Sequence, residues 1–114
     1  MEKFERLEKE AFDDISRKNY NKAASALYFS LHQLASKILR ILSERIPRRD
    51  DKLANAIENK GLLKAATALR ILYILRKKAD YTEEDVSERE ILEVLRVYED
   101  GKRELLNYLK KVER

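Results

Sequence analysis

Cysteine is absent from the 114-residue chain, and histidine occurs once, as His32. Without cysteine the chain has no disulfide framework, no thiolate zinc or iron–sulfur site and no cysteine nucleophile. No apolar run approaches the roughly 18 to 20 residues of a membrane span. The first residues, MEKFER, also lack the apolar core of a secretory signal. We therefore expect a cytoplasmic protein that makes no contact with a membrane.

Glycine and proline are scarce as well, with two glycines and one proline, which leaves little material for tight turns. Helix-forming Leu, Ala, Glu, Lys and Arg dominate instead. Charged residues make up 40% of the chain with both signs interspersed, a pattern typical of solvated helix faces and also of heat-adapted proteins. The net charge of +4 is modest, whereas nucleic-acid binders more often carry a concentrated basic stripe. Charge alone therefore indicates no partner.

Apolar residues recur every three or four positions along most of the chain, which is the spacing of one helix face. Pro47 and the polar residues after it predict a break in the middle of the chain. The spacing predicts five helices: one ending near Lys18, one from an N-cap at Asn21 to about Glu44–Ile46, a short one around Leu53–Ile57 closed by Gly61, one over Leu62–Lys78, and one from Ser87 onward.

Short connections between these helices favour antiparallel neighbours. We therefore expect a single all-α domain over residues 1–114, an up-and-down antiparallel bundle of four long helices and one short helix. The run Ile71–Leu75 is apolar all round, which predicts either a central helix or a dimer seam. The stripe of the last helix keeps its phase across Gly101, so that glycine is tolerated within the helix at roughly 1 kcal/mol against alanine.

The common catalytic and metal-binding motifs do not occur in the sequence. There is no HExxH, no pair of ExxH motifs, no Walker glycine loop and no GxSxG elbow. We therefore predict no metal and no cofactor. His32 lies beside the apolar stripe of its helix, one turn after Tyr28, and no ligand set surrounds it. A structural hydrogen bond is a better interpretation of His32 than a role as catalytic base, although its role stays open.

Polar groups converge at the end of the fourth predicted helix, in the segment RKKADY. We identify four candidate ligand-binding residues there: Arg76, Lys77, Asp80 and Tyr81. On spacing alone, a structural interpretation is favoured, in which cations complement the helix dipole and Arg76 pairs with Asp80 one turn later. Arg48 and Arg49 lie in the predicted loop that follows Pro47. They could bind phosphates, but solvated residues of a surface loop are the more common explanation.

The segment NYNKAASALYFS, residues 19–30, together with the later Arg76-x-x-x-Asp80-Tyr81, resembles the HEPN domain family. The resemblance covers nearly the whole chain. It is to a branch whose second helix opens with a small-residue-rich stretch containing Tyr-Tyr or Tyr-Phe, and whose later helix ends in Arg-x-x-Ala-Asp-Tyr. This resemblance implies a bundle of four to five helices, frequently a homodimer, which often works beside a small nucleotidyltransferase in toxin–antitoxin systems.

Many members of the HEPN family cut RNA with an arginine followed four to six residues later by a histidine. This chain departs from that pattern, because Arg76 aligns with the arginine but Asp80 and Tyr81 stand near the place of the histidine. An aspartate near its ordinary pKa is a poor general acid at neutral pH, so the sequence does not favour RNA cleavage in the family's manner.

Three functional hypotheses follow. The first is an interaction module, homodimeric, that binds a nucleotidyltransferase-type partner, a nucleotide or RNA around Arg76, Asp80 and Tyr81. The second is a ribonuclease toxin with a non-standard active site, in which Tyr81 or Asp80 works with Arg76. The third is a structural helical adaptor in which Arg76 and Asp80 form an ordinary salt bridge.

Overall fold

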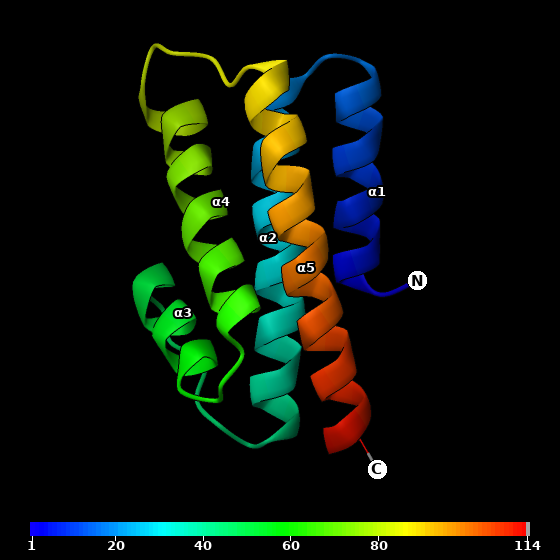
Figure 1. Ribbon diagram of the computed structural model, residues 1–114, viewed down its shortest axis with the longest axis vertical. Helices are drawn as coiled ribbons and strands as arrows, with labels where there is room; N and C mark the ends of the chain where they lie inside the picture. The colour runs from blue at the N-terminus through cyan, green and yellow to red at the C-terminus, as the bar shows by residue number, and fades with distance from the viewer. Residues whose placement is uncertain (114) are drawn as a thin grey trace.

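The computed structural model describes residues 1–113, which form five helices joined by short connections (Figure 1). These residues contain no strand, so the predicted all-α bundle of four long helices and one short helix is confirmed. None of the five helices is both long and apolar enough to cross a membrane. The elements are α1 (Lys3–Ser16), α2 (Tyr20–Ile41), α3 (Asp50–Glu58), α4 (Leu63–Tyr81) and α5 (Glu88–Val112).

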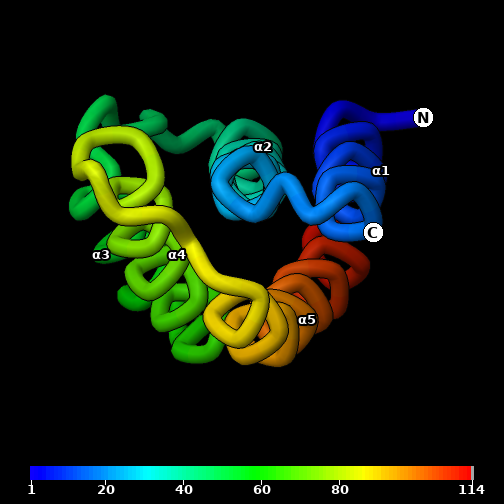
Figure 2. The backbone as a smooth tube through the Cα atoms, turned by 90° about the horizontal axis from the view of Figure 1, so that it is seen from above, coloured from blue at the N-terminus to red at the C-terminus, as the bar shows by residue number. Residues whose placement is uncertain are grey.

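Helix α2 lies at the centre of the bundle. It packs against α1, α4 and α5, while α3 packs on α4 (Figure 2). In Figure 1, α1 and α4 rise and α2 and α5 descend. The sequence predicts that Ile71–Leu75 lies in a central helix or at a dimer seam. In the structure, the central helix is α2. Helix α4 leaves Ile71 37% and Ile74 68% exposed.

Both ends of α2 differ from the sequence prediction. The predicted N-cap of α2 is Asn21, but the observed N-cap is Asn19, so α2 begins two residues earlier than predicted. The Asn21 side chain instead accepts a hydrogen bond from the Val86 backbone N–H at 2.8 Å and donates one to Asp85 at 3.0 Å. These bonds tie the start of α2 to the connection that leads into α5. Helix α2 also ends earlier than predicted, at Ile41.

Other terminus signals act as the sequence predicts. Ser87 caps α5, where its hydroxyl accepts a hydrogen bond from the Glu90 backbone N–H, and the Glu90 side chain accepts one from the Ser87 N–H in return. Gly61 closes α3 with a φ of +81°, in the left-handed region that glycine enters without strain.

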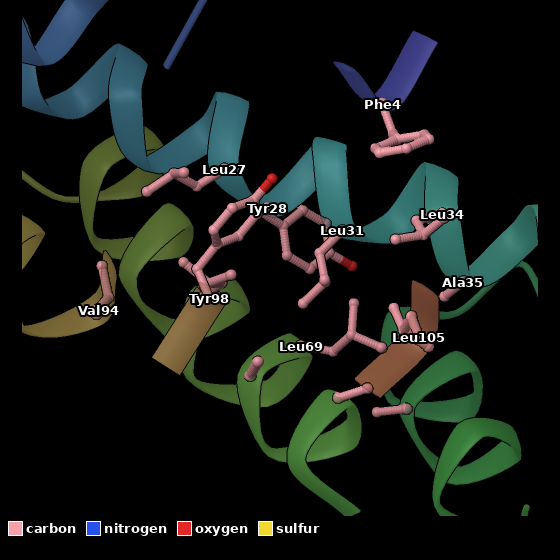
Figure 3. Close-up of a cluster of buried hydrophobic side chains, with 14 of the residues drawn as sticks. Phe4, Leu27, Tyr28, Leu31, Leu34, Ala35, Leu69, Val94, Tyr98 and Leu105 are labelled. Carbon is pink, nitrogen blue, oxygen red and sulfur yellow. The ribbon is translucent and has the colours of Figure 1, made fainter. Parts of the chain in front are cut away.

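A polar network joins three of the helices at Tyr98, which lies among the buried apolar side chains of the core (Figure 3). The hydroxyl of Tyr98 on α5 lies 2.8 Å from Ser30 Oγ on α2 and donates a hydrogen bond to Glu8 on α1 at 3.0 Å. Lys102, one turn after Tyr98, forms an ion pair with the same Glu8 carboxylate. Because each buried polar atom in this network has a partner, α1 is fixed against α2 and α5 in one orientation.

Gly101 allows α4 and α5 to pack closely. A Cβ built on Gly101 would lie 2.8 Å from the Cβ of Ala68 and 3.3 Å from the Cα of Ala65. Such separations leave no room for a methyl group. From the sequence, we predict only that the helix tolerates Gly101. In the structure, the absence of a side chain at Gly101 allows α4 and α5 to approach each other.

We expect Gly101→Ala to destabilise the protein, although alanine is the better helix former. The propensity gain is about 1 kcal/mol, and the overpacking cost is about 1 to 3 kcal/mol. The free energy of unfolding, measured in urea, should therefore fall by about 1 kcal/mol. The same substitution in an Ala68→Gly background should cost less, because the clashing methyl is gone. A Gly101→Ala protein more stable than wild type would contradict this account of the α4–α5 contact.

Candidate binding site around Arg76

The side chain of Arg76 leaves α4 and lies over two aromatic rings of α2. Its guanidinium carbon is 4.7 Å from the ring centre of Phe29 and 5.6 Å from that of Tyr28. A planar cation over an aromatic face is attracted by the negative charge of that face. Tyr28 is buried and Phe29 is 36% exposed, so Arg76 sits at the rim of the core.

Asp80 is the acidic partner of Arg76. Its Oδ2 lies 3.3 Å from Arg76 Nε, and its Oδ1 accepts a weak hydrogen bond from Ser25 Oγ at 3.4 Å. The Nε atom of Arg76 is buried, yet it donates no hydrogen bond within residues 1–113. Buried donors without a partner are uncommon. The guanidinium is thus positioned by ring contacts and by charge, and part of its hydrogen-bonding capacity is left unused.

Asp50 and His32 form a second polar cluster next to Tyr28. The Tyr28 hydroxyl donates a hydrogen bond to Oδ1 of Asp50, the first residue of α3. His32, one turn after Tyr28, places its Nε2 3.9 Å from the same oxygen and its Nδ1 3.4 Å from Ser36 Oγ. Burial, followed by the nearby Asp50 carboxylate, raises the pKa of Tyr28 well above 10, so this hydroxyl stays protonated.

The His32 imidazole is partly buried, with 22% of its side chain exposed. Burial lowers its pKa below the ordinary 6.5, the Asp50 carboxylate acts in the opposite direction, and the Arg76 cation lowers the pKa further. The imidazole is therefore mostly neutral at pH 7 and can accept a proton. Arg76 is on α4 and His32 is on α2, yet the charge of Arg76 lowers the pKa of His32.

Of the four candidate residues at the end of α4, the structure brings two into direct contact and leaves one apart. Arg76 and Asp80 pair, and the Nζ of Lys77 lies 5.2 Å from the ring centre of Tyr73. Tyr81 is 70% exposed, and the cation over its ring is Lys77, at 5.9 Å. Five helical residues turn the chain by about 140°, so Tyr81 and Arg76 face different directions.

Sequence reasoning missed the cluster of side chains around Tyr28, the ring on which Arg76 lies. The cluster consists of Tyr28, Phe29, His32, Asp50 and Tyr73. Tyr28 and His32 are four residues apart, so the sequence alone indicates that their rings are neighbours on α2. The two ring centres lie 5.8 Å apart. Nothing in the sequence pattern pairs these residues with Arg76 or with Asp50, because those contacts depend on how the helices pack.

No protein-family model matches the chain, and neither the curated proteins nor the solved structures include a significant match to it.

The single histidine allows a direct test of this electrostatic arrangement by NMR titration. We expect the His32 imidazole to titrate below pH 6.5. Arg76→Gln should raise its pKa, because a neighbouring cation is lost, and Asp50→Asn should lower it, because a neighbouring carboxylate is lost. Shifts of the same sign in both variants would contradict the arrangement.

The same pKa has a consequence for stability. A lowered folded-state pKa means that the unfolded chain binds this proton more readily. The contribution of neutral His32 is therefore complete above about pH 6.5 and is lost as the pH falls through the folded-state value.

Proposed function

We propose that the chain is a HEPN-like interaction module that binds a phosphate-bearing ligand, either a nucleotide or RNA, at Arg76. The observation that carries the proposal is the guanidinium held over the rings of Tyr28 and Phe29, where its buried Nε faces Asp80 Oδ2 at 3.3 Å without forming a hydrogen bond. A planar, permanently charged fork fixed in this way suits bidentate recognition of phosphate. Lys77 adds a second cation, and the partly exposed ring of Tyr73 is available to stack on a base.

The positions of the two resemblance motifs support the HEPN assignment. Residues 19–30 lie at the start of α2 and supply Ser25, Tyr28 and Phe29. Arg76 and Asp80 lie near the end of α4. Although about fifty residues separate the motifs in sequence, the arginine of one lies on the aromatic residues of the other. A shared functional site would explain why both motifs occur together.

Exposed apolar residues on α4 support the further proposal of a protein partner. Leu63 is 60%, Ile74 68% and Tyr81 70% exposed. Their spacing of eleven and seven residues places them on one side of the helix. A second copy of the chain, or a nucleotidyltransferase-type protein of a toxin–antitoxin system, would cover this stripe. Light scattering of the purified chain separates a homodimer from a monomer.

A ribonuclease with a non-standard active site is the second candidate, and the position of His32 favours it. The histidine missing after Arg76 in the sequence has a counterpart on α2, next to Asp50. His32 would take the proton of a ribose 2′-hydroxyl, the oxygen would attack the adjacent phosphorus, and the departing 5′ oxygen would take a proton from solvent. Arg76 would stabilise the charge that develops on the phosphoryl oxygens. His32 thus replaces Tyr81 and Asp80 as the proposed partner of Arg76.

Replacement of Arg76 tests the binding proposal. We expect Arg76→Gln to weaken the binding of ATP and of a short single-stranded RNA at least about tenfold, because a charge-assisted hydrogen bond contributes about 1.5 to 3 kcal/mol. Isothermal titration calorimetry measures both affinities. Asp80→Asn should strengthen binding, since the acid that competes with phosphate is removed.

Arg89 provides a matched control for this test. It forms the same type of ion pair with an acid four residues later, Glu93, but is almost fully exposed on α5. Arg89→Gln should leave both affinities unchanged. Equal affinities in the Arg76→Gln and Arg89→Gln proteins, or no affinity in wild type, would favour the structural adaptor.

Cleavage of a labelled RNA tests the second candidate. We expect His32→Ala to reduce the rate by about a hundredfold or more, the usual contribution of a general base. In wild type the rate should rise with pH through the lowered pKa of His32. Tyr81→Phe should leave the rate unchanged. A loss of cleavage in Tyr81→Phe but not in His32→Ala would assign the role to Tyr81 instead.

A further inference from the structure

A basic hollow lies in the connection between α2 and α3. Its volume is about 440 Å³, and it is lined by Arg45, Pro47, Arg48, Arg49 and Lys52. All four cations around it are exposed. The net charge of the whole chain gives no sign of this concentration, because acids elsewhere balance it.

The acids near the hollow are engaged by other groups. Glu44 pairs with Lys60, and Asp51 pairs with Arg49 in a two-pronged contact. Asp50 accepts the hydrogen bond of the Tyr28 hydroxyl. In contrast, Arg45, Arg48 and Lys52 form no ion pair with any residue in the described part of the chain, 1–113. Three exposed cations are therefore available to an anionic ligand.

The hollow adjoins the Arg76 site. Arg49 lines the hollow and directly precedes Asp50, and consecutive Cα atoms are about 3.8 Å apart. The Asp50 carboxylate contacts Tyr28 and His32, which belong to the Arg76 site. The partly exposed ring of His32 therefore lies between Asp50 and Tyr28, and the partly exposed ring of Tyr73 packs on Tyr28 with its centre 5.8 Å away.

The opposite side of the Arg76 site is acidic. Asp80 lines a hollow of about 370 Å³ whose α1 wall includes Glu10 and Asp14. A chain of phosphates is repelled from that side. It is attracted along the other direction, from Arg76 toward the connection before α3, because Arg45, Arg48 and Lys52 there outnumber the one carboxylate on the route, that of Asp50.

We propose that Arg76 and the basic hollow form one track for a single-stranded nucleic acid. One phosphate binds at Arg76 and others bind at Arg45, Arg48 and Lys52, while bases stack on the rings of His32 or Tyr73. The strand is single because a duplex hides the faces of its bases, whereas an unpaired base can lie flat on an aromatic ring. The inference rests on the proposed function, since it extends the phosphate site at Arg76 to a polymer. RNA and DNA share this backbone chemistry, and the test distinguishes them.

The test compares two triple variants with the same net charge. Arg45→Gln, Arg48→Gln and Lys52→Gln together remove the cations of the hollow. Arg96→Gln, Lys110→Gln and Lys111→Gln remove three exposed cations of α5 and serve as the control. The probes are AMP and single strands of uridine or thymidine nucleotides, about twelve residues long, which fits the site sizes of such proteins. Fluorescence anisotropy over about 50 to 500 mM salt gives the affinity and its salt dependence.

The hollow variant should bind the strand at least about tenfold more weakly than wild type at low salt. The slope of log affinity against log salt should decrease by about 2, since each phosphate contact contributes about 0.7 for a single strand. AMP binding should not change, and the control variant should keep the wild-type slope. Tighter binding of the uridine strand than of the thymidine strand would identify RNA as the ligand, and the reverse would identify DNA.

The outcomes separate this inference from the function on which it rests. If the hollow variant binds the strand as wild type does, while Arg76→Gln loses AMP, the track is wrong and the phosphate site stands. If Arg76→Gln changes neither affinity, the phosphate site itself is wrong. Duplex binding as tight as single-strand binding would also overturn the track.

Discussion

The burial of α2 against three neighbouring helices is the contact on which the rest of the structure depends. Its apolar residues exclude water from α1, α4 and α5 together, and this sets the place of every side chain that α2 carries. Tyr28 and Phe29 show the consequence. They are consecutive in sequence, yet one ring is in the core and the other reaches the surface. Arg76 lies over both rings, and so a permanent charge is held at the edge of the apolar interior.

The helices could be predicted from the sequence because helical periodicity is a local property. The caps at Ser87 and Gly61 and the pairing of Arg76 with Asp80 depend on residues at most four positions apart. The neighbourhood of Arg76 could not be predicted, because His32 approaches from a different helix and Asp50 from the far side of a loop. The role of Gly101 was missed for the same reason, since its neighbour Ala68 lies on another helix.

The proposed HEPN relationship gains a physical interpretation from this geometry. In the family's ribonucleases, as the resemblance implies, arginine and histidine occur within one short motif. Here the imidazole comes from α2 and the guanidinium from α4, with the ring of Tyr28 next to both. The neutral state of the imidazole and the fixed position of the guanidinium are properties that both binding and catalysis would use. The two functional candidates therefore differ in what happens to a bound phosphodiester rather than in where it lies.

The close packing of Gly101 against α4 also sets the position of Arg76 along the axis of the bundle. Ala68 precedes Arg76 by eight residues, or about 12 Å along the helix axis. Sliding α4 by a single turn would displace the guanidinium by about 5.4 Å and carry it off both rings. The contact between Gly101 and Ala68, more than two helical turns from Arg76, thus fixes the position of Arg76 along the bundle axis.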